Sequence, residues 1–162
     1  MRAVRPPAPA AAPGSVHATA IARHGRDGWR GVLLTGPSGS GKSDLALRLI
    51  ERGWRLVADD YCEVWASDGV VWAAAPPRIA GLVEARGVGI IPSVPPPLPL
   101  ARIALVAACG QVPVERLPQP DTELVAGIAL PRVVIDIRPA SAPETLQAAL
   151  KVTLDGLDVA PL

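Results

Sequence analysis

The chain has 162 residues, of which 49% are hydrophobic and 19% charged, so it is long enough for one domain with a buried core. Its formal net charge of +1 gives no overall basic field, and we therefore expect no nucleic-acid partner. The two cysteines, Cys62 and Cys109, lie far apart, which argues against a zinc site or a disulfide framework and fits a reducing compartment.

Residues 1–14 are rich in alanine and proline. The prolines interrupt any apolar core of a signal peptide, so we expect a disordered tail there rather than a leader. No apolar run approaches the roughly 20 residues of a membrane span. We therefore expect a cytoplasmic protein with one domain at 15–155, a tail at each end (1–14 and 156–162), and no contact with a membrane.

The first regular elements are predicted around a glycine-rich loop. Residues 31–35 form a short apolar run that is typical of a buried strand. Residues 42–52 carry a one-sided apolar stripe that predicts a helix, and Gly53 is a suitable end for it. Residues 55–60 form a second apolar run that ends in two carboxylates. The order strand, glycine loop, helix, strand predicts a βαβ unit.

The rest of the chain predicts a mixed sheet. Residues 61–65 and 70–74 flank an Asp-Gly pair and so predict a hairpin. The proline-rich residues 92–99 predict a loop or a sheet edge, and the prolines within 111–131 predict an irregular segment. Two further strands and a helix are expected at residues 103–108, 133–137 and 142–154. Together these elements predict a single α/β domain with a P-loop NTPase-like core.

A phosphate-binding loop is the clearest functional motif. The segment that fits G-x-x-x-x-G-K-[ST] consists of Gly36, Pro37, Ser38, Gly39, Ser40, Gly41, Lys42 and Ser43. Glycines let successive backbone N–H groups point at phosphate oxygens, and the start of the following helix adds partial positive charge. Lys42 can reach the β- and γ-phosphates of a nucleotide, and the Ser43 hydroxyl can ligate Mg²⁺. The motif therefore predicts nucleotide binding.

Several charged residues are candidates for the chemistry beside that loop. Asp59 and Asp60 end the next strand, where a carboxylate in P-loop proteins holds Mg²⁺ through water. Adjacent strand residues face opposite sides, so the two carboxylates cannot do the same job. If Asp60 points at the γ-phosphate, it can accept a proton from an attacking hydroxyl. Glu84 and Arg86 could place charge near the phosphates, but taken alone they are better explained by a surface ion pair.

Three motifs in this order resemble the catalytic domain of HPr kinase/phosphorylase. They are the P-loop and its continuation to Leu47, the segment Arg52-Gly-Trp-Arg-Leu-Val-Ala-Asp-Asp60, and Glu84-Ala-Arg-Gly-Val-Gly-Ile-Ile91. The resemblance is strongest over residues 31–91 and weaker from His17 to about residue 140. It implies a fold akin to phosphoenolpyruvate carboxykinase, a homo-oligomer (a hexamer in the family), and a kinase that uses ATP and Mg²⁺ to phosphorylate a serine of the phosphocarrier HPr, with regulation of the phosphotransferase system and carbon metabolism.

The same resemblance implies roles for individual residues. Lys42 matches the phosphate-binding lysine, Asp60 the general base, and Ser43 and Glu84 the Mg²⁺ ligands. The other positions that match family motifs, as active-site residues, are His17, Arg116, Arg138, Asp59 and Arg86.

The chain departs from typical members in two places. It carries Pro-Ala-Ser-Ala after Arg138 in place of the family's P-G-R-N loop, which is linked to the phosphorolysis of phospho-HPr. It is also short, and so resembles the forms found in alphaproteobacteria. These departures leave a second hypothesis open, in which the protein is an ATP-sensing regulatory module that phosphorylates little.

Overall fold

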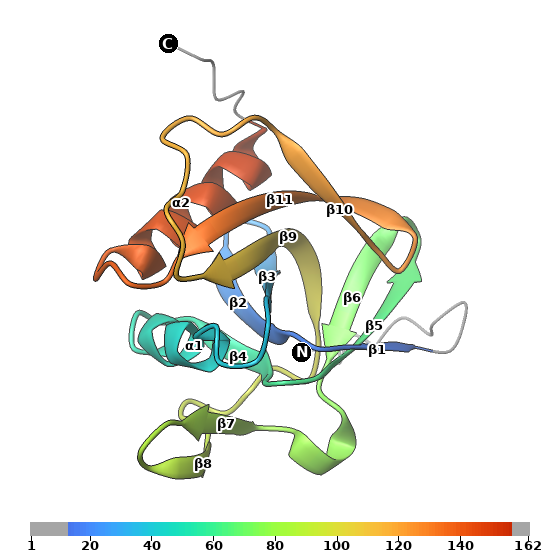
Figure 1. The fold of residues 1–162 in the computed structure, drawn as a ribbon. Coiled ribbons are helices and arrows are strands. Elements are labelled where there is room, and N and C mark those ends of the chain that lie inside the picture. The colour runs from blue at the N-terminus through green and yellow to red at the C-terminus, as the bar shows by residue number, and fades with distance from the viewer. Residues whose placement is uncertain (1–12, 157–162) are drawn as a thin grey trace.

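The computed structural model describes residues 13–156, as a curled sheet with two helices on one side and a small hairpin below it (Figure 1). The helices are α1 (Lys42–Ile50), the 3-10 turn η1 (Pro77–Ile79) and α2 (Ala142–Asp155). The strands are β1 (Gly14–Val16), β2 (Thr19–Gly25), β3 (Gly28–Thr35), β4 (Arg55–Ala58), β5 (Cys62–Ser67), β6 (Val70–Ala74), β7 (Leu82–Ala85), β8 (Gly89–Pro92), β9 (Ala101–Gly110), β10 (Asp121–Val125) and β11 (Ile128–Asp136).

Strand β9 is the centre of the main sheet. One edge of β9 pairs in parallel with β3, and the other edge pairs with β6 near its start and with β11 near its end. The full path runs β1-β5-β6-β9-β3-β2-β4, with β10 and β11 branching from β9. Because β3, β9 and β11 run in the same direction, their carboxyl ends lie at one end of the sheet. The loops that follow them meet there.

The predicted helices, the β5–β6 hairpin, the proline-rich loop and the strands at 103–108 and 133–137 are all confirmed. The predicted βαβ unit needs a correction. Strands β3 and β4 do run in the same direction, but β2 lies between them and pairs antiparallel with both. The segment that carries β2 gave no strand signal, because its apolar and small residues do not alternate clearly with polar ones.

The expected irregular segment at 111–131 is also partly wrong. Residues 121–125 form β10, and β11 begins at Ile128. Ala126 and Gly127 connect the two strands with positive φ angles of 49° and 81°, as a two-residue hairpin turn requires. Pro113, Pro118 and Pro120 all precede β10, and Pro131 lies within β11 opposite Thr122, so the prolines leave the hairpin intact.

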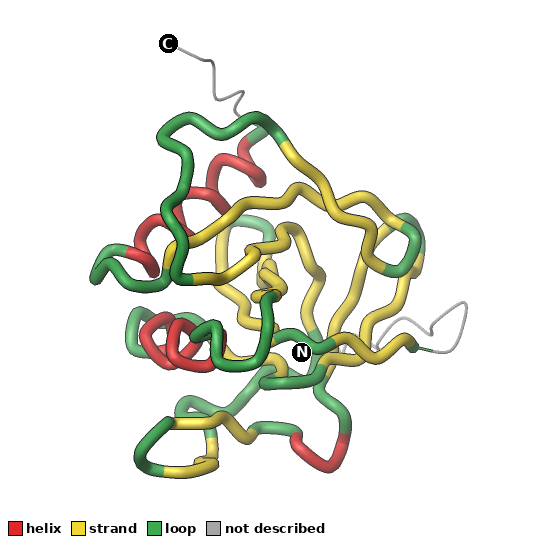
Figure 2. The backbone as a smooth tube through the Cα atoms, in the orientation of Figure 1, coloured by secondary structure: helices red, strands yellow, loops and turns green. Residues whose placement is uncertain are grey.

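Two apolar clusters hold the fold together. The first lies between the sheet and the helices, and both α1 and α2 contribute to it through Leu45, Leu49 and Leu146. The second packs on the other face of the sheet, around Leu33 and Val106. Figure 2 shows the two helices on the same side of the strands, which is what a shared cluster requires. The two helices therefore cover one face of the sheet.

An ion pair also joins the two helices. Arg52, just after α1, donates from Nε to Glu144 in the first turn of α2. This hydrogen bond holds the pKa of Glu144 below its usual range.

Of the tails expected at 1–14 and 156–162, residues 1–12 and 157–162 lie outside the described residues, and Gly14 already belongs to β1. Among the residues described, no helix combines the length and apolarity that a membrane crossing demands.

Candidate active site

The phosphate loop joins β3 to α1 and is pressed against the ends of two other parallel strands. Gly36 has a φ of 135°, and a Cβ atom there would lie 2.6 Å from the Cys109 carbonyl oxygen of β9. Gly41 has a φ of 94°, and a Cβ atom there would lie 2.7 Å from Ile137 Cδ1, just after β11. Both positions therefore need glycine for the conformation and for the space.

Lys42 and Ser40 give the loop its polar interior. Lys42 is the first residue of α1 and only 6% exposed, and its Nζ donates to the carbonyl oxygens of Gly36 at 2.9 Å and Pro37 at 3.1 Å. The Ser40 hydroxyl is buried and has no hydrogen-bond partner among the described residues. The first N–H groups of α1 also have no acceptor inside the helix. This set of donors fits a phosphate group.

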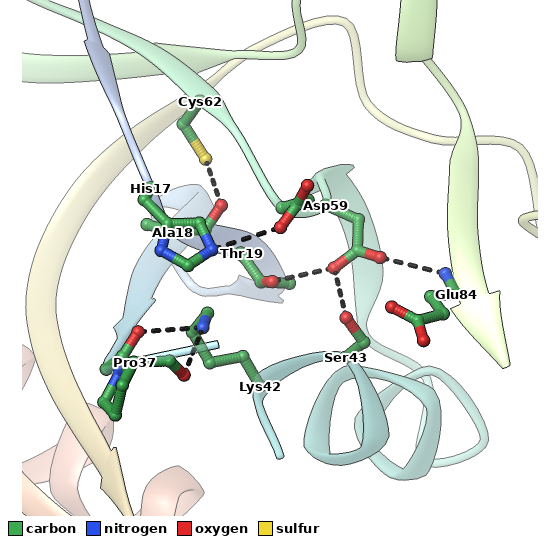
Figure 3. Close-up of polar contacts among 11 residues, drawn as sticks. His17, Ala18, Thr19, Pro37, Lys42, Ser43, Asp59, Cys62 and Glu84 are labelled. Atoms are coloured by element: carbon green, nitrogen blue, oxygen red, sulfur yellow. Dashed lines mark hydrogen bonds and ion pairs between the residues drawn. The ribbon is translucent and has the colours of Figure 1, made fainter. Parts of the chain in front are cut away.

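Asp59 connects three separate elements around the loop. Its Oδ1 accepts from Ser43 Oγ of α1 at 2.8 Å and from Thr19 Oγ1 of β2 at 2.7 Å, and its Oδ2 accepts from the backbone N–H of Glu84 in β7 at 2.9 Å. Figure 3 shows these donors converging on the carboxylate. Asp59 is only 5% exposed, so three donors satisfy a charge that would be costly to bury alone. Asp59 therefore fixes the position of Ser43.

Asp60 lies in a different environment from its neighbour. Both residues follow the end of β4 at Ala58, rather than ending the strand, and Asp60 has a positive φ of 68°. Its side chain is 63% exposed, and its Oδ1 lies 3.1 Å from His17 Nε2. An ionised carboxylate only accepts hydrogen bonds, so Nε2 carries the proton in this contact. The ring of Tyr61 lies 5.3 Å from that of His17, centroid to centroid. The two aspartates thus differ in burial and in partners, and their separate roles stay predictions.

Glu84 and Arg86 lie on the β7–β8 hairpin beside the loop. The Glu84 backbone contacts Asp59, while its carboxylate is half-exposed and turns towards Ser43 (Figure 3). Arg86 is exposed and its Nε lies 3.8 Å from Glu84 Oε1, so the surface ion pair exists. Among the described residues, no group of three or more His, Cys, Asp or Glu side chains gathers as a metal site of its own.

The two other predicted arginines are not drawn into this cluster. Arg138 follows β11 next to Ile137, and it forms a two-point ion pair with Asp136 through Nε and Nη2. These bonds hold the pKa of Asp136 below its usual range. Arg116 is exposed in the loop after β9 and makes neither an ion pair nor a side-chain hydrogen bond with any described residue. Its role in the active site stays a prediction.

Both cysteines are unpaired and buried close to this site. Cys62 donates its thiol to the Ala18 carbonyl oxygen at 3.2 Å, and Cys109 lies at the end of β9 behind Gly36. Burial raises the pKa of each thiol to about 12. A thiol of that pKa is almost wholly protonated near neutral pH, so neither cysteine is a nucleophile.

Thr19 is the site residue that the sequence did not indicate. It is fully buried, and nothing in its surroundings in the chain marks it as polar and functional. Its proximity to Asp59 arises only because β2 lies beside β4 in the sheet. Its place two residues after His17 was the available signal, although His17 itself lies in the bend before β2.

We expect the Thr19→Val variant to unfold more easily than the wild-type chain. Valine has the same shape but leaves Asp59 Oδ1 with one donor fewer in a buried position, which costs about 1–3 kcal/mol. Urea unfolding followed by circular dichroism measures the difference. Thr19→Ser keeps the hydroxyl and should recover most of the stability, whereas equal losses in both variants would contradict the role of this hydrogen bond.

Comparison with known proteins agrees with this geometry. The family model of the HPr serine kinase C-terminal domain matches residues 12–94, about half of the chain, from β1 to the end of the β7–β8 hairpin. The chain belongs to this family. The resemblance seen in the sequence motifs is therefore confirmed, and all of the P-loop, both aspartates and Glu84 fall within the matched segment.

The curated relatives that match this chain are named HPr kinase/phosphorylase. The chain is 54% identical over 61 residues to the HPr kinase/phosphorylase of Clostridium kluyveri, and 53% identical over 62 residues to that of Lacticaseibacillus casei. Each match covers 38% of this chain, but only 20% and 19% of the respective relative. The match thus spans about a fifth of the length of these relatives.

A solved structure covers much more of the chain. The Hpr(Ser) kinase/phosphatase from Coxiella burnetii superimposes with a TM-score of 0.74, over 90% of this chain and 99% of that one. The two share 23% sequence identity. This similarity confirms a mixed α/β fold of the kind that the sequence predicted, including the parts outside the family match.

Proposed function

We propose that this chain is an ATP- and Mg²⁺-dependent protein serine kinase whose substrate is the phosphocarrier HPr. The proposal rests on family membership and on one feature of the site. An exposed carboxylate, Asp60, lies directly after the buried Asp59 that holds Ser43 of the phosphate loop. A protein that only binds a nucleotide has no need of a second carboxylate open to solvent at this place.

The residues provide for each part of a phosphoryl transfer. The amides of the loop and Lys42 would bind the β- and γ-phosphates of ATP. The serine oxygen of HPr forms the new bond to the γ-phosphorus, the bond from that phosphorus to the β,γ-bridging oxygen breaks, and ADP leaves. Asp60 accepts the proton of the serine hydroxyl. The His17 Nε2–H holds the Asp60 carboxylate in position, at 3.1 Å.

The residues around Asp59 fit a magnesium ion that accompanies the nucleotide. The Ser43 hydroxyl donates its proton to Asp59, so its lone pairs are available to a cation. Ser43 would be a direct ligand, and Asp59 and Glu84 would hold the water ligands or complete the shell. When bound, the ion neutralises charge that develops on the phosphates.

Further proposed properties of the protein rest on its family membership alone. They are a core akin to P-loop NTPases and to phosphoenolpyruvate carboxykinase, assembly as a homo-oligomer, and a cytoplasmic role in regulating the phosphotransferase system. Arg116, Arg86 and Arg138 are proposed to contact the phosphates or HPr once Arg138 leaves its ion pair with Asp136.

Transfer of labelled phosphate tests the proposal. The chain is incubated with γ-labelled ATP, Mg²⁺ and purified HPr, with HPr lacking its acceptor serine as the control. We expect label on the unaltered HPr only. Saturable ATP binding without label on HPr would overturn the kinase proposal and would favour the ATP-sensing module instead.

A further inference from the structure

Three arginines form a row on the sheet, at the end away from the phosphate loop. Arg30 of β3 lies directly opposite Arg102 of β9, and Arg23 of β2 lies directly opposite Arg30. Residues directly opposite in a ladder project from the same face, with Cβ atoms about 5 Å apart. The row therefore places three arginine side chains on the same face of three neighbouring strands.

No acidic side chain neutralises this row. All three arginines are half-buried, and none of them forms an ion pair within the described residues. Arg30 Nη1 donates to the Trp29 carbonyl oxygen at 3.1 Å, and that is the only side-chain hydrogen bond of the row within residues 13–156. Asp68 and Asp155, which adjoin the cavity-lining residues Gly69 and Leu154 in the chain, make no ion pair with it either. Like charges directly opposite in a sheet are destabilising, so the row costs stability that a bound anion would restore.

Two arginines of the row border an open cavity lined by both polar and apolar groups. Arg30 and Arg102 line a space of about 240 Å³, together with Val70 of β6, Leu130 of β11 and Leu154 of α2. An apolar wall reduces screening by water and so strengthens the attraction between a guanidinium and an anion. Arginine also binds phosphate and carboxylate groups through two parallel hydrogen bonds.

We propose that Arg30 and Arg102 bind the oxyanion group of a small organic anion, whose apolar part lies against Leu130 and Leu154. Arg23, next in the row, adds positive charge to the site. The site is separate from the phosphate loop and does not depend on the proposed kinase function. Phosphate and carboxylate groups share the required chemistry, and the experiment distinguishes them.

Two simple anions test the site by calorimetry, phenyl phosphate and benzoate. The background is the full chain with Lys42→Ala, which weakens phosphate binding at the P-loop. We expect saturable binding of at least one anion at one site per chain. Arg30→Gln and Arg102→Gln should each weaken it about tenfold or more, the loss expected for a charge-assisted hydrogen bond. Arg78→Gln, the same change at an exposed arginine that does not line the cavity, should leave affinity within about twofold.

Thermal unfolding separates loss of a ligand contact from loss of the fold. Arg102→Gln relieves repulsion, so its Tm without ligand should equal or exceed that of the background chain, while the anion should raise the Tm of the background chain only. Binding of phenyl phosphate alone would show that the site takes a phosphate group. Binding of both anions would show that it takes either a carboxylate or a phosphate group. Absence of saturable binding, or unchanged binding in the Arg30→Gln/Arg102→Gln double variant, would overturn the proposal.

Discussion

The Asp60→Asn variant should bind ATP as the wild-type chain does and transfer phosphate to HPr about 10²- to 10⁴-fold more slowly, the usual contribution of a general base. Asparagine has the same shape and still offers Oδ1 to His17 Nε2, but it cannot take the serine proton. The residue lies outside the buried set that holds Ser43, so the phosphate loop should be unaffected. Calorimetry measures ATP affinity, and label on HPr measures kcat.

Asp68→Asn is a matched control for that variant. Asp68 is also an aspartate with a positive φ, 51° against 68° for Asp60, but it lies in the β5–β6 turn. Asparagine tolerates positive φ as well as aspartate does, so both variants should fold. Transfer should be unchanged in Asp68→Asn. Retained transfer in Asp60→Asn would remove Asp60 as the base and would direct attention to His17.

The phosphate loop was predictable because its chemistry is local. Glycine spacing, the preceding apolar strand and the helical stripe after Lys42 all lie within about twenty residues, and each is confirmed. The β5–β6 hairpin was predictable for the same reason, since Asp68 and Gly69 determine its turn. In such segments the sequence neighbours are also the spatial neighbours, so composition and periodicity contain enough information.

The surroundings of Asp59 were not predictable in the same way. The carboxylate itself was a candidate, but its donors come from β2, α1 and β7, which are far apart in the chain. The insertion of β2 between β3 and β4 brings Thr19 and His17 to the two aspartates. The packing of the whole sheet determines this strand order among the several that are possible. Short-range patterns do not encode it, and the role of His17 came from family resemblance.

The Lys42→Ala variant should weaken ATP binding by about 10- to 100-fold, the range expected for loss of a charge-assisted hydrogen bond to phosphate. Lys42 is 6% exposed, and its Nζ lies within the curve of the loop, on the carbonyl oxygens of Gly36 and Pro37. Alanine removes the only lysine of the loop and leaves only amide and hydroxyl donors for the phosphates. Phosphoryl transfer should fall further than affinity, because the charge that develops on the γ-phosphate in the transition state also loses its cation.

Lys151→Ala provides the matched control, since it makes the same change at an exposed position of α2. Its ATP affinity, transfer rate and Tm should all stay at wild-type values. The Tm of Lys42→Ala requires separate measurement, because this variant also loses the two hydrogen bonds that hold the loop closed on itself. Weaker ATP binding at an unchanged Tm would assign the effect to phosphate contact. Unchanged ATP affinity in a folded Lys42→Ala chain would show that the backbone amides alone bind the phosphates, and the loop would then act through its glycines and the start of α1.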